Sequence, residues 1–209
     1  MNAALEQLKT EFGMHGSSWA LWDESGKIEP IIKTEEISSL IKPNIIFLGL
    51  NASILVQDAW AGFHQECRVK DSFKTQKVKR LADLLQENEF KVFYGAYMTD
   101  IIKDQYAHDS DVVSKKFTED ESSIKRNLDL FNRELDFLAK ISNSNKFTVI
   151  CMGNNVCEII ELAVNKGFLN QDTVALHKIT HYAWRAPIEA YKERVRGELR
   201  NILKGCQLQ

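Results

Sequence analysis

The sequence has no apolar run long enough to cross a membrane, which excludes one large class of proteins. A membrane-spanning helix needs about 18 or more consecutive apolar residues, and no stretch of this chain approaches that length. The opening residues, MNAALEQLKTEFG, form an amphipathic pattern with acidic side chains, unlike a signal or transit peptide. We therefore expect a soluble, cytoplasmic protein with no membrane partner.

Cysteine is also scarce, and its spacing argues against disulfides and bound metal. The four cysteines form no Cys-x-x-Cys pair and have no histidines at zinc-finger spacing; they are Cys67, Cys151, Cys157 and Cys206. His177 and His181 are four residues apart, but they lie on a predicted strand and loop instead of a helix. We expect reduced thiols, two of them in the core, and neither a metal nor another cofactor.

Neither charge nor low-complexity sequence divides the chain. The formal net charge is −2 and the isoelectric point is about 6.2, so an extended basic surface is not expected, although a local basic patch is compatible with these values. No linker, repeat or charge block interrupts the 209 residues, of which 44% are apolar. We expect a monomer with one domain, residues 1–209, in which residues 1–43 form a helical part packed on the rest.

What the sequence does contain is an alternation of strand-like and helix-like segments. Short runs rich in β-branched and aromatic residues predict strands at 44–50, 92–98, 147–152 and 173–179. Apolar residues at helical spacing predict helices at 5–12, 35–41, 77–86, 122–141, 156–166 and 187–203. Strands that alternate with helices form parallel sheets covered on both faces. The predicted fold is therefore a three-layer α/β/α domain with a mainly parallel sheet of about four strands.

Polar or turn-forming residues stand at the carboxyl end of each predicted strand. They are Asn51, Thr99, Asp100, Gly153, Asn154 and His181. Ligands of open α/β sheets bind beyond the carboxyl ends of the strands, so these residues form a candidate site. Asn, Asp and Gly also end strands simply because they tolerate turns, and that alternative stands for each residue taken singly.

Four short motifs recur around these strand ends: GLNAS, FHQ, GAYMTDIIKD and ICMGN, beginning at residues 49, 63, 95 and 150. In sequence and in order they resemble the motifs of the uracil-DNA glycosylase superfamily, most closely its uncharacterised bacterial branch. The chain differs in two places: Ala52 stands where proline is usual, and HYAW at 181–184 stands where relatives have His-Pro-Ser. The resemblance spans residues 44–184.

The resemblance implies that the chain hydrolyses the N-glycosidic bond of uracil or a related deaminated base in DNA. Cleavage passes through an oxocarbenium-like sugar and leaves negative charge on the departing base. By resemblance Asn51 positions the attacking water, because an amide orients water but cannot act as a strong base. His181 is implied to donate a hydrogen bond to the carbonyl of the base.

Two alternatives stay open for this chemistry. His181 is equally compatible with a structural role as a hydrogen-bonded loop histidine. The HYAW departure is compatible with a catalytically silent member that binds a nucleobase, nucleotide or nucleic acid without cleaving it, because function depends on the site and not on the fold.

Base contacts follow from the same resemblance. A target base must leave the duplex and be held by stacking and by hydrogen bonds to its edge. Phe63 is the stacking candidate, and Asn154 is a candidate for reading the base edge. Thr99 and Asp100 are expected to line the same pocket, Asp100 chiefly by orienting its neighbours. The alternatives are that Phe63 packs beneath its own loop and that Asn154, or Asn155, caps the following helix.

Contacts to the DNA backbone need basic side chains, and one stretch supplies them. Residues 68–80 hold six basic side chains against one acid; they are Arg68, Lys70, Lys74, Lys77, Lys79 and Arg80. Trp184 and Arg185 follow His181 and are candidates to wedge into the base stack. The alternatives are a solvated helix face for the basic stretch and local packing for the tryptophan.

Overall fold

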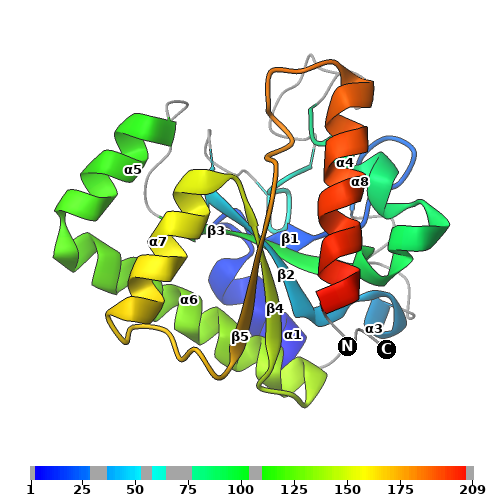
Figure 1. The fold of residues 1–209 in the computed structure, drawn as a ribbon. Helices are drawn as coiled ribbons and strands as arrows, with labels where there is room; N and C mark the ends of the chain where they lie inside the picture. Colours follow the sequence, from blue (N-terminus) through cyan, green and yellow to red (C-terminus); the bar gives the residue numbers. More distant parts are fainter. Residues whose placement is uncertain (1–2, 29–36, 53–57, 65–76, 104–109, 206–209) are drawn as a thin grey trace.

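The computed structural model describes residues 3–28, 37–52, 58–64, 77–103 and 110–205, which form a five-stranded mixed sheet between helices (Figure 1). The strands lie in the order β1-β3-β2-β4-β5; they are β1 (Ser18–Trp19), β2 (Lys42–Asn51), β3 (Ala96–Ile102), β4 (Phe147–Met152) and β5 (Val174–Ile179). β2 to β5 are parallel, which confirms the mainly parallel α/β sheet. The sheet has one strand more than predicted, since β1 pairs antiparallel with β3 and is too short to show a strand pattern.

Helices cover both faces of this sheet (Figure 1). One layer contains α1 (Ala3–Phe12), α3 (Ile37–Leu40), α5 (Ser110–Glu119), α6 (Glu121–Ser142) and α7 (Asn154–Asn165). The other contains α4 (Lys79–Leu85), the 3-10 helix Asn88–Phe93 and α8 (Ile188–Gly205). The sequence did not predict α5. Within the described ranges, no helix is both long and apolar enough to span a membrane.

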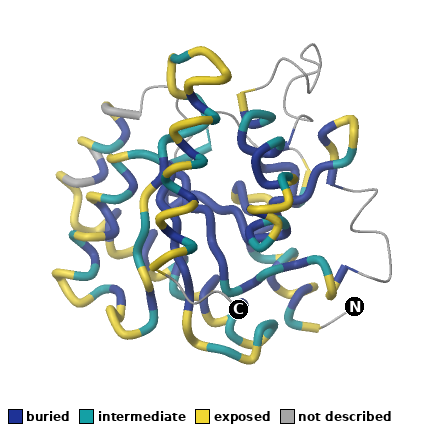
Figure 2. The backbone as a smooth tube through the Cα atoms, turned by 45° about the vertical axis from the view of Figure 1, so that its right-hand side comes forward, coloured by how far each residue is buried: buried dark blue, intermediate teal, exposed yellow. Residues whose placement is uncertain are grey.

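The two cores meet the sheet through alternating side chains of the central strand β2. Ile46 and Leu48 pack in the layer that contains α6, whereas Ile45 and Phe47 pack in the layer that contains α8. All four side chains are buried. Because both faces of β2 are buried, its sequence is a nearly continuous run of apolar residues. Figure 2 shows the strands as the buried centre of the molecule and the exposed residues on the outer helices.

The second predicted strand is displaced along the chain. It was expected at 92–98, but β3 begins at Ala96 and Phe93 belongs to the 3-10 helix. Gly95 separates the two elements with φ at 88°, and a Cβ there would come closer than 3.0 Å to the carbonyl oxygen of Leu40. Phe93 belongs to the 3-10 helix, and its side chain packs in the layer that contains α8. Because a buried helical residue is as apolar as a strand residue, composition alone placed the start of the strand too early.

Helix starts also differ from the expected caps. Gly153, not Asn154 or Asn155, is the N-cap of α7, and no side chain caps that helix, so the predicted asparagine cap is wrong. The long helix α6 begins after Asp120, whose carboxylate accepts the backbone N–H of Ser122 at 3.0 Å.

The strand order creates a switch point at the middle of the sheet. The chain passes from β2 to β3 on one side of β2 and then crosses to β4 on the other side. Connections that leave neighbouring strands in opposite directions open a crevice outside the carboxyl ends of the strands. The carboxyl ends of the parallel strands β2, β3, β4 and β5 lie together at this edge of the sheet, called the carboxyl edge below.

Candidate functional site

Gly49 brings the end of β2 against β3 and the following loop. Gly49 is paired in register with Asp100 of β3. A Cβ on Gly49 would come closer than 3.0 Å to Oδ1 of Asp100 and within 3.5 Å of Cζ of Phe63. The absence of a side chain on Gly49 therefore lets the Asp100 carboxyl and the Phe63 ring approach the same point of the sheet.

Asp100 holds a buried carboxyl group at this point. The residue is 5% exposed, and its Oδ2 would lie 3.1 Å from a Cβ on Gly16. Among the described residues, none forms a hydrogen bond or ion pair with this carboxyl. Burial raises the pKa of Asp100 to about 7; the positive charge of Lys103 opposes this rise and the negative charge of Glu134 adds to it.

His181 lies beside the end of β4. A Cβ on Gly153, the residue after β4, would be 3.6 Å from Cβ of His181. The backbone N–H of Ala183 donates to Nδ1 of His181 at 3.0 Å, so the proton of the neutral ring is on Nε2. Burial, and then the positive charge of Lys77, lower the pKa of His181 to about 4. At neutral pH the ring is therefore uncharged, and its Nε2–H is a hydrogen-bond donor.

Aromatic rings connect His181 to the loop after β2. The His181 and Tyr182 rings lie 4.2 Å apart between centroids, at an interplanar angle of 31°. The Tyr182 ring meets Phe63 edge to face at 6.5 Å. A continuous line of neighbours thus runs from Gly153 through these three rings to Gly49, where Asp100 is also in place.

The loop that carries Phe63 is fixed by the N-terminal segment. Phe63 is half-buried with φ at 63°, and its carbonyl oxygen accepts the Trp22 indole N–H at 3.3 Å. The next residue, His64, is buried, with Nε2 2.7 Å from Oγ of Ser18 and Nδ1 3.2 Å from the carbonyl oxygen of Gly26. The histidine of the FHQ motif therefore anchors the loop, a role that the sequence did not reveal.

The two asparagines of the candidate site lie at the same edge. Asn51 is the last residue of β2, is half-buried and donates from Nδ2 to its neighbour's carbonyl oxygen, that of Ala52, at 3.0 Å. Asn154 is exposed in the first turn of α7, directly after β4. That these two residues share one pocket with Phe63 and His181 stays a prediction.

Thr99 points away from Asp100, toward α6. Its hydroxyl donates to Oε1 of Glu134 at 2.8 Å, and the hydroxyl of Tyr97 donates to the same oxygen at 2.7 Å. Lys103 Nζ lies 2.7 Å from Oε2 of Glu134 and also contacts Thr99. This buried polar network supports β3 from beneath, so Thr99 is part of the scaffold and does not line the carboxyl edge beside Asp100. Strand alternation places positions 97, 99 and 103 on one face and was the signal that could have found it.

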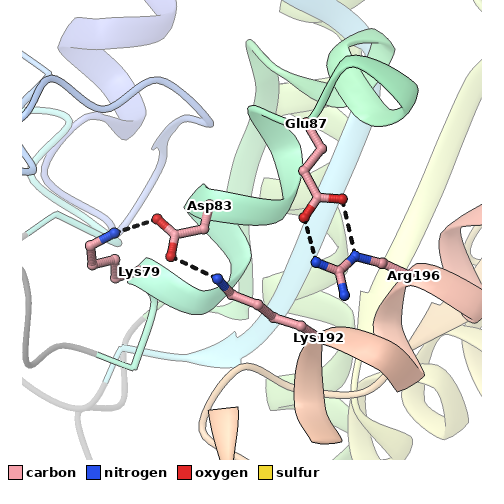
Figure 3. Close-up of polar contacts among 5 residues, drawn as sticks. All are labelled: Lys79, Asp83, Glu87, Lys192 and Arg196. Atoms are coloured by element: carbon pink, nitrogen blue, oxygen red, sulfur yellow. Dashed lines mark hydrogen bonds and ion pairs between the residues drawn. The ribbon is translucent and has the colours of Figure 1, made fainter. Parts of the chain in front are cut away.

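The described part of the basic stretch is mostly engaged in holding the fold (Figure 3). Lys79 contacts the Asp83 carboxylate, whose other oxygen accepts from Lys192 of α8 at 3.0 Å. The Arg80 guanidinium donates to the carbonyl oxygens of Trp184 (3.2 Å) and of Ala186 (3.1 Å). These contacts tie α4 to α8 and to the loop after β5.

The remaining predicted DNA contacts divide into described and undescribed positions. Lys77 is exposed and close enough to His181 to lower its pKa. Trp184 and Arg185 are exposed in the loop after His181, and the Arg194 guanidinium lies 5.2 Å from the centroid of the Trp184 ring. The other members of the basic stretch lie outside the described residues; they are Arg68, Lys70 and Lys74.

The described residues were also searched for metal sites and for hollows away from the carboxyl edge. No group of three or more His, Cys, Asp or Glu side chains in the described part of the chain is arranged to hold a metal ion. A hollow of about 280 Å³ lies at the opposite, amino-terminal edge of the sheet, between α1, α3, the start of β2 and the end of α6. Leu5, Pro43 and Ser142 are among its lining residues, and it is called the amino-edge hollow below.

No family model matches the chain, and neither the curated proteins nor the solved structures contain a significant match. The resemblance of the short motifs to the uracil-DNA glycosylase superfamily stays a prediction.

Proposed function

We propose that the chain is a DNA glycosylase that hydrolyses the N-glycosidic bond of uracil or a related deaminated base. The observation that carries the proposal is the neutral His181 ring, with its proton on Nε2, in line with the aromatic rings at the carboxyl edge. This edge is where ligands of open α/β sheets bind.

The state of His181 suits the departure of a base. When the glycosidic bond breaks, negative charge develops on the base and its carbonyl oxygens. A fixed donor aimed at that charge stabilises the transition state without any reorganisation. Because burial and then Lys77 lower its pKa to about 4, the imidazole is neutral at neutral pH and donates through Nε2.

The other groups take complementary roles. Asn51, at the end of β2, is suited to orient the attacking water, since an amide offers both a donor and an acceptor. The Phe63 and Tyr182 rings offer apolar surfaces for an extruded base. Lys77 and Arg185 are exposed near His181 and suit contacts to phosphates, and Trp184 beside them suits contact with unstacked bases.

A protein that binds a base without cleaving it is the second candidate. Tyr182 stands where the resemblance has proline, and its ring covers one face of the His181 ring at 4.2 Å. A covered histidine has less freedom to follow the charge on a leaving base. Under this second candidate the protein binds a base and does not cleave the glycosidic bond.

A cleavage assay distinguishes the two candidates. Oligonucleotides containing uracil, hypoxanthine or xanthine, single- and double-stranded, are incubated with the protein, and abasic sites are revealed by alkali. We expect cleavage by the wild type and a loss of roughly 10²-fold or more in the single-turnover rate for both Asn51→Ala and His181→Ala.

The exposed Asp136 of α6 supplies the control, because Asp136→Asn changes a polar side chain that has no predicted role in binding or cleavage. Its rate should equal that of the wild type. Absence of cleavage on every substrate, with base binding retained, would remove the glycosylase and leave the binding protein.

A further inference from the structure

The loop that carries His181 has no proline to stiffen it. It consists of residues 180–186, between β5 and α8, and is called the histidine loop below. Two backbone hydrogen bonds lie within it, from Trp184 N–H to the His181 carbonyl oxygen and from Ala186 N–H to that of Trp184, both at 2.9 Å. Such bonds shape the turns of the loop but do not fix its place on the sheet. Because a donor stabilises a transition state only when it is aimed in advance, contacts with other elements must hold the loop.

Glu198 of α8 binds the first residue of the histidine loop through both carboxylate oxygens. Its Oε2 accepts the backbone N–H of Thr180 at 2.6 Å, and its Oε1 accepts the Thr180 hydroxyl at 2.8 Å. Thr180 directly follows β5, which has a neighbouring strand on one side only, so a side chain supplies the acceptor that a further strand would supply elsewhere. Hydrogen bonds to a carboxylate are about twice as strong as those between neutral groups. Two of them to one residue fix its orientation as well as its position.

Arg194, one turn earlier in α8, joins this carboxylate to the far end of the loop. Its Nε donates to Oε1 of Glu198 at 3.2 Å, and its guanidinium lies 5.2 Å from the centroid of the Trp184 ring. Arg80 of α4 donates to the carbonyl oxygen of Trp184 from another side. The histidine loop is therefore held at Thr180 and at Trp184, with His181 between these two points.

Resting on the proposed function, we propose that Glu198 is a positioning residue, which aims the His181 ring at the base by fixing the residue before it. Glu198 acts through Thr180 and donates nothing to the base. A displacement of about 1 Å at a reacting group can cost about 10²-fold in rate, so a loose start of the histidine loop should slow cleavage. The carboxylate is required because it accepts on both oxygens, whereas a glutamine amide accepts on one only.

The place of His181 on the sheet can be observed directly. A Cβ on Gly153, at the end of β4, would be 3.6 Å from Cβ of His181, so a Gly153 α proton points at the His181 side chain. The nuclear Overhauser effect between this proton and the His181 β protons is therefore strong when the histidine loop is in place. It should weaken when the loop is released, whether or not the protein cleaves DNA.

The test compares this nuclear Overhauser effect in the wild type and three variants. Glu198→Gln should lose most of its intensity, and Thr180→Val, which lacks the hydroxyl but keeps the backbone N–H, should lose part of it. Glu87→Gln is the matched control, because the Glu87 carboxylate also holds α8 by two hydrogen bonds, to Arg196 at 3.0 and 2.7 Å, yet does not contact the histidine loop (Figure 3). It should keep the wild-type intensity.

The rate of uracil excision gives the second readout. In single-turnover assays Glu198→Gln should cleave roughly 10- to 10²-fold more slowly than the wild type. The protein concentration that gives half the maximal rate should stay the same, because Glu198 does not contact the substrate. Glu87→Gln should match the wild type in both quantities.

Loss of the nuclear Overhauser effect and of rate in Glu198→Gln, with Glu87→Gln unchanged, supports the proposal. Wild-type intensity in Glu198→Gln, an equal loss in Glu87→Gln, or a wild-type rate despite a lost nuclear Overhauser effect overturns it.

The proposed function is judged separately, by cleavage with the wild type. Excision by the wild type, together with an unchanged Glu198→Gln, would keep the glycosylase and remove the role of Glu198. No excision by the wild type, together with a lost nuclear Overhauser effect in Glu198→Gln alone, would remove the glycosylase and keep Glu198 as the residue that positions His181.

Discussion

Replacing Asp100 with asparagine should remove a fall in the stability of the fold between about pH 4 and pH 7. Burial raises the folded-state pKa of this carboxyl to about 7, above its ordinary value of 3.8. Between these values the unfolded chain has lost the proton while the folded chain keeps it. Wild-type stability therefore falls as pH rises from about 4 to 7 and levels off above that, and the asparagine variant lacks this loss.

The size of the effect follows from the two pKa values. One pKa unit corresponds to about 1.4 kcal/mol. Between pH 5 and pH 8 the unfolding free energy of the wild type, relative to Asp100→Asn, should fall by roughly 2 to 3 kcal/mol. The unpaired buried amide of Asp100→Asn shifts the unfolding free energy of that variant by the same amount at every pH. The change of the difference with pH is therefore unaffected.

Urea unfolding of both proteins at several pH values measures the difference. Other titrating groups are common to the two chains and cancel. Asp136→Asn, which alters an exposed carboxylate, should show no such slope. A wild-type minus Asp100→Asn difference that is flat from pH 5 to pH 8 would refute the burial argument.

Three further changes test other parts of the structure. Gly49→Ala should lower the unfolding free energy by about 1–3 kcal/mol, because the new Cβ would collide with the Asp100 carboxyl. In the background of Asp100→Ala the same change should cost much less, as measured by urea unfolding of the single and double variants. Additive costs would contradict the collision. Asp120→Ala should cost about 0.5–2 kcal/mol by removing the α6 cap, and an unchanged urea midpoint would dispute that. Lys77→Glu should weaken binding to single-stranded DNA of any sequence and reduce the salt slope by about 0.7, whereas an unchanged slope would place the strand elsewhere.

The parallel strands could be predicted because they are short, continuous apolar runs rich in β-branched and aromatic residues. β4 occupies the predicted residues 147–152, since a short apolar run bounded by polar and glycine residues has few other interpretations. The 3-10 helix before β3 could not be found, because Phe93 is selected for burial and composition does not distinguish a buried helical turn from a strand. β1 depends on pairing with β3, a long-range contact that no local pattern encodes.

The candidate site was predictable in outline and not in detail. Position after a strand placed Asn51, Asp100 and His181 at one edge, because parallel strands share a carboxyl edge. The same rule did not predict the orientation of Thr99. Neighbouring residues of a strand face opposite sides of the sheet, and the Thr99 hydroxyl faces Glu134, which is far away in the sequence. The isolation of the Asp100 carboxyl depends on three-dimensional neighbours and has no sequence signal.

The measurement that tests the central claim most directly is where on the protein a base binds. An oligonucleotide containing 2′-fluoro-deoxyuridine is suitable, because the fluorine opposes the oxocarbenium-like sugar and keeps the glycosidic bond intact. Backbone amide shifts are followed by NMR during the titration. Binding at the carboxyl edge predicts the largest shifts at Gly49, Phe63, Gly153 and Tyr182, whereas shifts confined to the amino-edge hollow, or none at all, would contradict the site and the function proposed for it.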